Sequence, residues 1–144
     1  MNKTFRPAFK SIKRKWYIID CKDKQLGRLA SLITKILSGK SKSYYYPGFD
    51  LGDHIILINA DLIVVNNSIN RLYVFKPGRP GSSLKKIVNI LPQTLIRRCI
   101  YRMMPPGIAK HRLSKRLKIY PDSNHPHVAQ HPIYINDINN FINN

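Results

Sequence analysis

Residues 16–38 read WYIIDCKDKQLGRLASLITKILS, in which one hydrophobic pattern gives way to another. Residues 16–20 are a continuous aromatic and β-branched run, which is typical of a strand buried on both faces. After a turn, apolar residues recur at spacings of three and four, which predicts a helix over residues 25–38. We expect Asp23 or a neighbour to cap this helix, and Gly39 to end it in a left-handed turn.

The rest of the chain continues the alternation of short apolar runs and helical spacing. The expected strands are residues 54–59, 62–65 and 71–75, with 117–120 as a strand or extended segment. The expected helices are 82–91, interrupted by Pro92, then 95–103 and 108–116. Everything after residue 120 is expected to be irregular. The order of elements predicts one α/β domain with a largely buried sheet over residues 16–134, a basic arm at 1–15 and an irregular tail at 135–144.

Composition restricts the class of protein. The chain has 144 residues, of which 43% are hydrophobic, so it can bury the core of one domain and is not a disordered basic tail. No run approaches the roughly twenty apolar residues that cross a bilayer, and the N-terminus lacks the apolar segment of a secretory signal. Cys21 and Cys99 are expected to be buried free thiols in a reducing compartment.

The charge of the chain is strongly unbalanced. The net charge is +18, and thirteen Lys and Arg residues occur between Leu62 and Pro121 without one Asp or Glu. The first nineteen residues add six basic residues and again no acid. Because such charges repel one another in a compact protein, a polyanion is the expected partner. Nucleic acid is the leading candidate and an anionic membrane surface a weak second.

The sequence can also be examined for three kinds of ligand site: a dinucleotide site, a magnesium site and a zinc site. A dinucleotide site is disfavoured, because the turn before the first helix holds one glycine, Gly27. Asp50 and Asp53 lack further oxygen ligands for magnesium, and are better explained as loop-capping carboxylates or partners of Lys and Arg. His125, His127 and His131 have no nearby cysteine to complete a zinc site, and are expected to contact RNA. We therefore predict no enzyme activity, no cofactor and no metal.

The basic residues gather at a few places along the chain. Lys40 and Lys42 precede three tyrosines, Arg79 lies in a Pro- and Gly-rich loop, and a cluster of five follows from Lys110 to Lys118. Arg79 and Arg112 are the first choices for bidentate phosphate contacts. The full set of expected RNA-binding residues is Lys13, Arg14, Lys40, Lys42, Tyr44, Arg79, Arg98, Arg102, Lys110, Arg112, Lys115, Arg116, Lys118, His125 and His127.

Several motifs resemble one known family. They are KWYIID at 15–20, LGRLA at 26–30, DLGD at 50–53, RPG at 79–81, and MMP at 103–105 followed by LKIY and HPH. Their order and spacing resemble those of the large-subunit ribosomal protein L13 family in its bacterial and organellar form. The resemblance covers residues 15–133.

The resemblance implies a fold, a function and partners. It implies a three-layer α/β/α fold with a small, mostly parallel central sheet, and a structural role in the large ribosomal subunit. The implied partners are large-subunit ribosomal RNA, bound early in assembly, and neighbouring ribosomal proteins, with no membrane and no small-molecule substrate. The skew towards Ile, Asn and Lys suggests an AT-rich genome, so a plastid is favoured over a mitochondrion or a bacterial cytoplasm. An RNA-binding regulator outside the ribosome and a nucleotide-using enzyme remain as alternatives.

Overall fold

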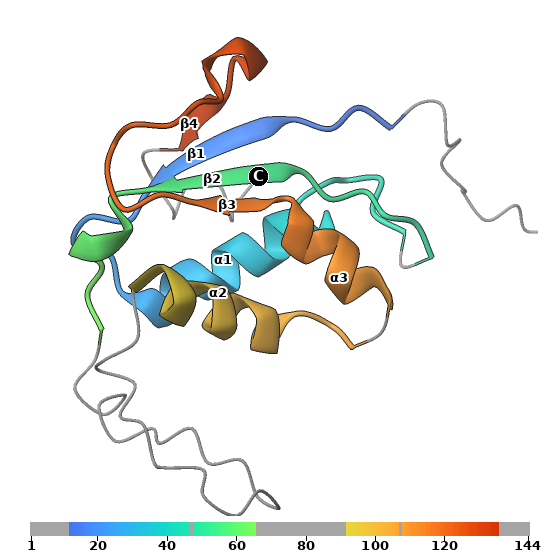
Figure 1. The fold of residues 1–144 in the computed structure, drawn as a ribbon. Coiled ribbons are helices and arrows are strands. Elements are labelled where there is room, and N and C mark those ends of the chain that lie inside the picture. The colour runs from blue at the N-terminus through green and yellow to red at the C-terminus, as the bar shows by residue number, and fades with distance from the viewer. Residues whose placement is uncertain (1–11, 47, 66–91, 107, 136–144) are drawn as a thin grey trace, which may run out of the picture.

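A computed structural model of the chain describes residues 12–46, 48–65, 92–106 and 108–135. Its centre is a sheet of four parallel strands in the order β3-β2-β1-β4 (Figure 1). The strands are β1 (Trp16–Asp20), β2 (His54–Ile58), β3 (Leu117–Ile119) and β4 (Ile133–Ile135). The prediction of a single α/β domain with a small parallel sheet is confirmed. The predicted strand at 71–75 and helix at 82–91 lie outside the described residues.

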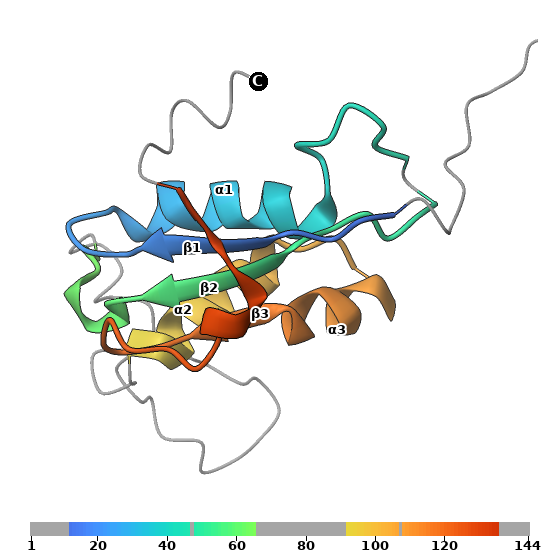
Figure 2. The same ribbon diagram turned by 90° about the horizontal axis from the view of Figure 1, so that it is seen from above.

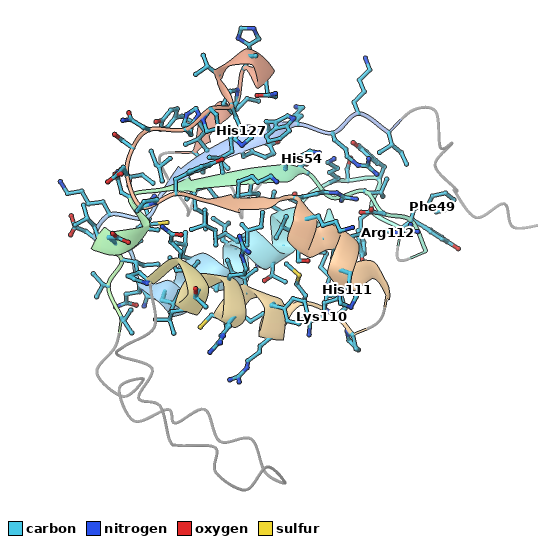
Figure 3. All side chains as sticks on the ribbon, in the orientation of Figure 1. Phe49, His54, Lys110, His111, Arg112 and His127 are labelled. Atoms are coloured by element: carbon cyan, nitrogen blue, oxygen red, sulfur yellow. The ribbon has the colours of Figure 1, made fainter. Side chains whose placement is uncertain are left out.

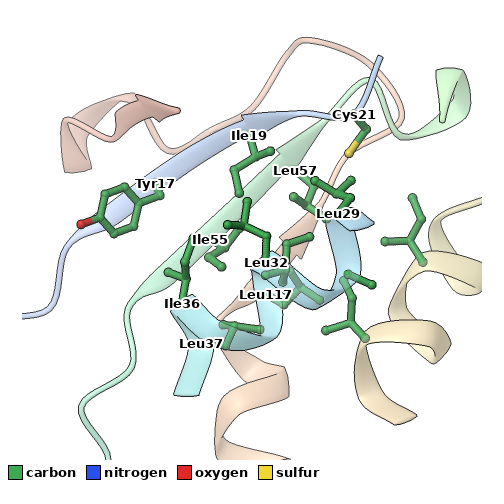
Figure 4. Packing of buried hydrophobic residues seen from close by; sticks show 14 of the residues in the cluster. Tyr17, Ile19, Cys21, Leu29, Leu32, Ile36, Leu37, Ile55, Leu57 and Leu117 are labelled. Carbon is green, nitrogen blue, oxygen red and sulfur yellow. The ribbon is translucent and has the colours of Figure 1, made fainter. Parts of the chain in front are cut away.

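The two central strands are buried on both faces, as their unbroken apolar runs predict. On one face, Ile19, Ile55 and Leu57 join the main core between the sheet and the helices (Figure 4). On the other face, Ile18 and Ile56 belong to a smaller cluster with Trp16 and Tyr120 packed against it. The sheet therefore needs cover on both sides.

The first helix, α1 (Leu26–Ser38), packs seven buried residues against the sheet and ends at Gly39, which has the expected left-handed conformation with φ of 77°. Its predicted cap is wrong. Asp23 lies in the preceding turn with φ of 57°, and Gln25 is the residue before the helix, with no side-chain cap. The Leu26 N–H instead donates to the carbonyl of Val64 at 3.0 Å, so a distant backbone segment satisfies the helix start.

Two further helices cover the same face of the sheet (Figure 1). Helix α2 (Pro92–Met103) begins at its proline, where a missing N–H costs no hydrogen bond, and buries Ile96 and Ile100 in the main core. Helix α3 (Ile108–Lys115) follows and leads directly into β3. None of the helices in the described part of the chain is long and apolar enough to cross a membrane.

Two short segments differ from their predicted structure. Residues 62–65 are not a strand of the sheet: Ala60–Leu62 form a 3-10 helix, η2, after Asn59 turns left-handed, and Val64 makes only an isolated bridge to Gln25. Conversely, the segment expected to be irregular supplies β4, which pairs with β1. Three residues are too few to show a strand period, so only the tertiary pairing identifies them.

The face of the sheet away from the helices is covered by the segment between β3 and β4 (Figure 2). This segment contains the 3-10 helix η5 (Val128–Gln130). Among the described residues, the second outer layer is therefore irregular chain with one 3-10 turn, whereas α1, α2 and α3 form the first.

Candidate nucleic-acid interface

The outer side of α2 and α3 carries basic side chains without acidic neighbours in sequence. We call these residues the basic helix surface: Arg97, Arg98, Arg102, Lys110, Arg112 and Lys115. All are exposed except Lys110, which is half-buried. Helix α2 turns Ile96 and Ile100 into the core and α3 turns Leu113 into it, which leaves polar positions of both helices outward. Lys110 and Arg112 are labelled in Figure 3. Arg97 was not among the predicted contacts, although its place beside Arg98 on the same exposed side could have suggested it.

An aromatic contact joins the two helices of this surface. The Lys110 ammonium lies 4.2 Å from the centre of the Tyr101 ring, and the Tyr101 and His111 rings are 6.3 Å apart. A cation over an aromatic face is attracted to the ring by its quadrupole. The contact holds the start of α3 against α2, so basic residues from both helices keep a fixed spacing.

Arg116 does not belong to the outer surface. Its side chain is buried, with 8% of the residue exposed, and it forms a bidentate ion pair with Asp50, whose Oδ1 accepts from Nη1 at 2.7 Å. The same guanidinium donates to the Gly52 carbonyl at 3.1 Å. Burial alone would raise the pKa of Asp50, but the Arg116 hydrogen bond and the charges of Arg116 and Arg14 lower it overall. Arg116 thus holds the 50–53 segment against the end of α3.

Lys42 is likewise turned inward. Its ammonium donates to Asp53 Oδ1 at 2.7 Å and to the Leu51 carbonyl at 2.8 Å, and only 11% of its side chain is exposed. The buried Asp53 carboxylate also accepts the backbone N–H of Lys15 at 2.9 Å. Asp50 and Asp53 are therefore partners of basic residues, as expected. No group of three or more potential metal ligands occurs in the described part of the chain.

The other predicted residues that the structure describes lie near the end of α1, on β3 and in the 125–131 segment. Lys13, Arg14, Lys40 and Tyr44 are exposed near the end of α1, and Arg79 lies outside the described residues. Lys118 is exposed on β3, whose neighbours Leu117 and Ile119 face the helices, so Lys118 faces the opposite side. The predicted set is thus not one continuous patch.

Of the histidines in the 125–131 segment, His127 makes contacts within the protein. His127 Nε2 and the Tyr120 hydroxyl are 2.9 Å apart, and the His127 ring lies 5.3 Å from Trp16. Within the described residues, His125 Nδ1 is buried without a hydrogen-bond partner. His127 is therefore better assigned to packing the segment onto the sheet than to contacting RNA.

Comparison with known proteins identifies the family of this chain. The profile of the family described as "Ribosomal protein L13" matches residues 14–126. The chain is 48% identical over 137 residues to "Large ribosomal subunit protein uL13c" of Trieres chinensis, covering 95% of this chain and 99% of that one. It is 41% identical over 138 residues to "Large ribosomal subunit protein uL13" of Crocosphaera subtropica, covering 92% and 91%. The chain belongs to the ribosomal protein L13 family.

This L13-family chain also has a histidine that the sequence did not single out. His54 stacks on Trp16 with ring centres 4.2 Å apart and planes 9° from parallel, because the two begin β2 and β1 in register. Burial, followed by the positive charges of Arg116 and Arg14, lowers the pKa of His54. Only the parallel register, which the sequence does not specify, brings the two rings together.

We expect His54 to make the stability of the protein depend on pH. Since its folded-state pKa is lowered, the unfolded chain binds a proton more readily, and the free energy of unfolding falls as pH drops below the ordinary histidine range. His54→Phe keeps an aromatic ring on Trp16 but cannot titrate. Urea unfolding between about pH 7 and pH 5 should give a flatter pH dependence for this variant. The exposed His111→Phe is the matched control, and an unchanged slope for His54→Phe would contradict the expectation.

Proposed function

We propose that this chain is a structural protein of the large ribosomal subunit, which binds large-subunit ribosomal RNA and helps its early assembly. The observation that carries the proposal is the basic helix surface on a member of the L13 family. The proposed role is structural rather than enzymatic. Its proposed partners are ribosomal RNA and neighbouring ribosomal proteins.

The geometry supports binding by several phosphate contacts at once. The apolar sides of α2 and α3 are packed into the core, so Arg98, Arg102 and Arg112 extend from rigid elements. A guanidinium can donate to two phosphate oxygens, and each contact releases condensed counterions from the RNA. Arg116 supports the end of α3 from inside through its ion pair with Asp50.

We place this protein in a plastid ribosome. The support is its similarity to the chloroplast protein uL13c and to cyanobacterial uL13 proteins, together with the Ile-, Asn- and Lys-rich composition. The relatives are matched over nearly their whole length, so the proposal applies to the domain as a unit.

The proposal predicts a specific loss of RNA binding when the basic helix surface is neutralised. Arg98→Gln, Arg102→Gln and Arg112→Gln together should weaken binding to a large-subunit ribosomal RNA fragment by about a hundredfold or more at low salt. The slope of log affinity against log salt should fall by about two, because roughly 0.7–0.9 is lost for each phosphate contact. Fluorescence anisotropy over a salt series measures both quantities.

A matched control separates position from total charge. The control variant removes three positive charges, as many as the first variant, from exposed positions elsewhere, two of them on α1: Lys22→Gln, Arg28→Gln and Lys35→Gln. If both triple variants lose affinity equally, only net charge matters and the chosen surface is wrong. Co-sedimentation of the protein with large subunits at high salt tests the ribosomal role itself, because an RNA-binding regulator outside the ribosome would be washed away.

A further inference from the structure

Three consecutive tyrosines stand exposed on the loop that follows α1. We call residues 39–46 the tyrosine loop. Tyr44, Tyr45 and Tyr46 have 38%, 37% and 38% of their surface exposed, so a part of each residue is open to solvent. The basic helix surface lies on α2 and α3, so it does not explain these rings.

Hydrogen bonds within the loop and to the 50–53 segment fix the conformation of the tyrosine loop. Gly39 turns left-handed, and backbone N–H groups of Lys42 and Tyr45 donate to the carbonyls of Gly39 and Lys42 at 3.1 and 3.0 Å. The Lys42 ammonium is anchored on Asp53 and the Leu51 carbonyl. The rings are therefore presented by an ordered series of turns, so little ordering entropy is lost when they bind a partner.

The electrostatics of the loop favour a polyanion over a protein partner. The two carboxylates of the adjoining 50–53 segment are occupied, Asp53 by Lys42 and Asp50 by Arg116. Lys40 is exposed on the loop. The basic segment before β1 contacts the loop, since the Lys42 ammonium lies 3.5 Å from the Lys13 carbonyl. The outward charges around the rings are therefore basic. Aromatic rings flanked by basic side chains are the arrangement that binds single-stranded nucleic acids.

We infer that the tyrosine loop is a second RNA site, which stacks unpaired bases of ribosomal RNA on Tyr44, Tyr45 and Tyr46. This inference rests on the proposed function and adds the kind of RNA bound. Bases inside a duplex already stack on each other, so protein rings reach only bases that are unpaired or splayed out. The basic helix surface contacts phosphates of folded RNA, whereas the loop recognises single-stranded segments.

The two sites differ in how they respond to salt. Stacking contributes affinity without releasing counterions. Phosphate contacts contribute affinity and also release counterions. Replacing all three tyrosines with alanine in the full chain should weaken binding of a single-stranded oligouridylate of about eight nucleotides by about tenfold or more, with the salt slope unchanged. Binding of an RNA duplex of similar length should stay within about twofold, since duplex bases are not available for stacking. Replacing the tyrosines with phenylalanine should restore oligouridylate binding, because the ring faces remain.

A control and a direct probe complete the experiment. Tyr134→Ala removes a ring that is 56% exposed on β4, outside the loop, and should leave oligouridylate binding unchanged. Ultraviolet crosslinking of 4-thiouridine-labelled oligouridylate, followed by mass spectrometry, should identify peptides containing the tyrosine loop. Circular dichroism checks that each variant is folded.

The outcomes separate this inference from the proposed function. If the alanine variant binds oligouridylate as wild type does and no crosslink reaches the loop, the inference is overturned, and the tyrosines instead suit a protein neighbour. If the alanine variant also loses duplex binding and salt dependence, the loop acts through phosphates and the stacking role is wrong. If wild type binds neither RNA and fails to join large subunits, the proposed function itself fails.

Discussion

Gly52→Ala is expected to prevent stable folding. A Cβ atom at this position would lie 1.7 Å from the Leu37 carbonyl oxygen and 2.7 Å from its carbonyl carbon. Both atoms belong to the backbone of the last turn of α1, so no side-chain rotation can relieve the overlap. The 50–53 segment would have to move away from the helix, which would also disturb the Arg116 contacts with Asp50 and the Gly52 carbonyl. We expect a loss of more than about 4 kcal/mol, seen as insolubility or as unfolding at much lower urea concentration.

Gly27→Ala is the matched control for this change. Gly27 lies in the first turn of α1, and an added Cβ would meet no atom within 4 Å. Alanine has the higher helix propensity, so this variant should gain up to about 1 kcal/mol of stability. Equal urea midpoints for Gly52→Ala and wild type would show that the loop does not pack on α1 as described.

Lys42→Met should destabilise the protein far more than loss of an exposed lysine would. The Asp53 carboxylate is 1% exposed and would keep the Lys15 N–H but lose its ionic partner. Leaving a buried charge without its ionic partner costs about 3–5 kcal/mol, whereas an exposed ion pair contributes about 0–1 kcal/mol. Urea unfolding measures the loss, and hydrogen exchange at the Lys15 amide should become faster as the arm loosens.

Two companion variants test the cause. Lys42→Met with Asp53→Leu removes both charges and should be more stable than Lys42→Met alone, giving a coupling energy in a double-mutant cycle. Lys40→Met removes the exposed lysine two residues away and should change stability by less than about 0.5 kcal/mol. If Lys42→Met costs no more than Lys40→Met, the buried pair does not hold the loop.

Strong local patterns predicted the centre of the fold correctly. The unbroken apolar run of β1 requires burial on both faces of the strand, and the apolar residues spaced three and four apart in α1 require burial of one helix face. Gly39 ends the helix where expected. Weaker local signals failed where distant backbone intervened. The start of α1 is satisfied by Val64 rather than by Asp23, and β4 exists because β1 offers it an edge. Neither partner is visible within a short window of sequence.

The acid-free run of basic residues, the helical apolar stripes and the L13 motifs are properties of the sequence itself. They predict an α/β domain, a polyanionic partner and the family, since composition and periodicity do not depend on long-range contacts, and the α/β domain and the family are confirmed. Which basic residues face outward was decided only by the tertiary structure. Lys42 differs little from Lys40 in its local sequence, and Arg116 little from Lys115, yet Arg116 is buried and Lys42 is turned inward with 11% of its side chain exposed. The reason is that their partners, Asp53 and Asp50, lie 11 and 66 residues away along the chain, and only folding brings each carboxylate to its base.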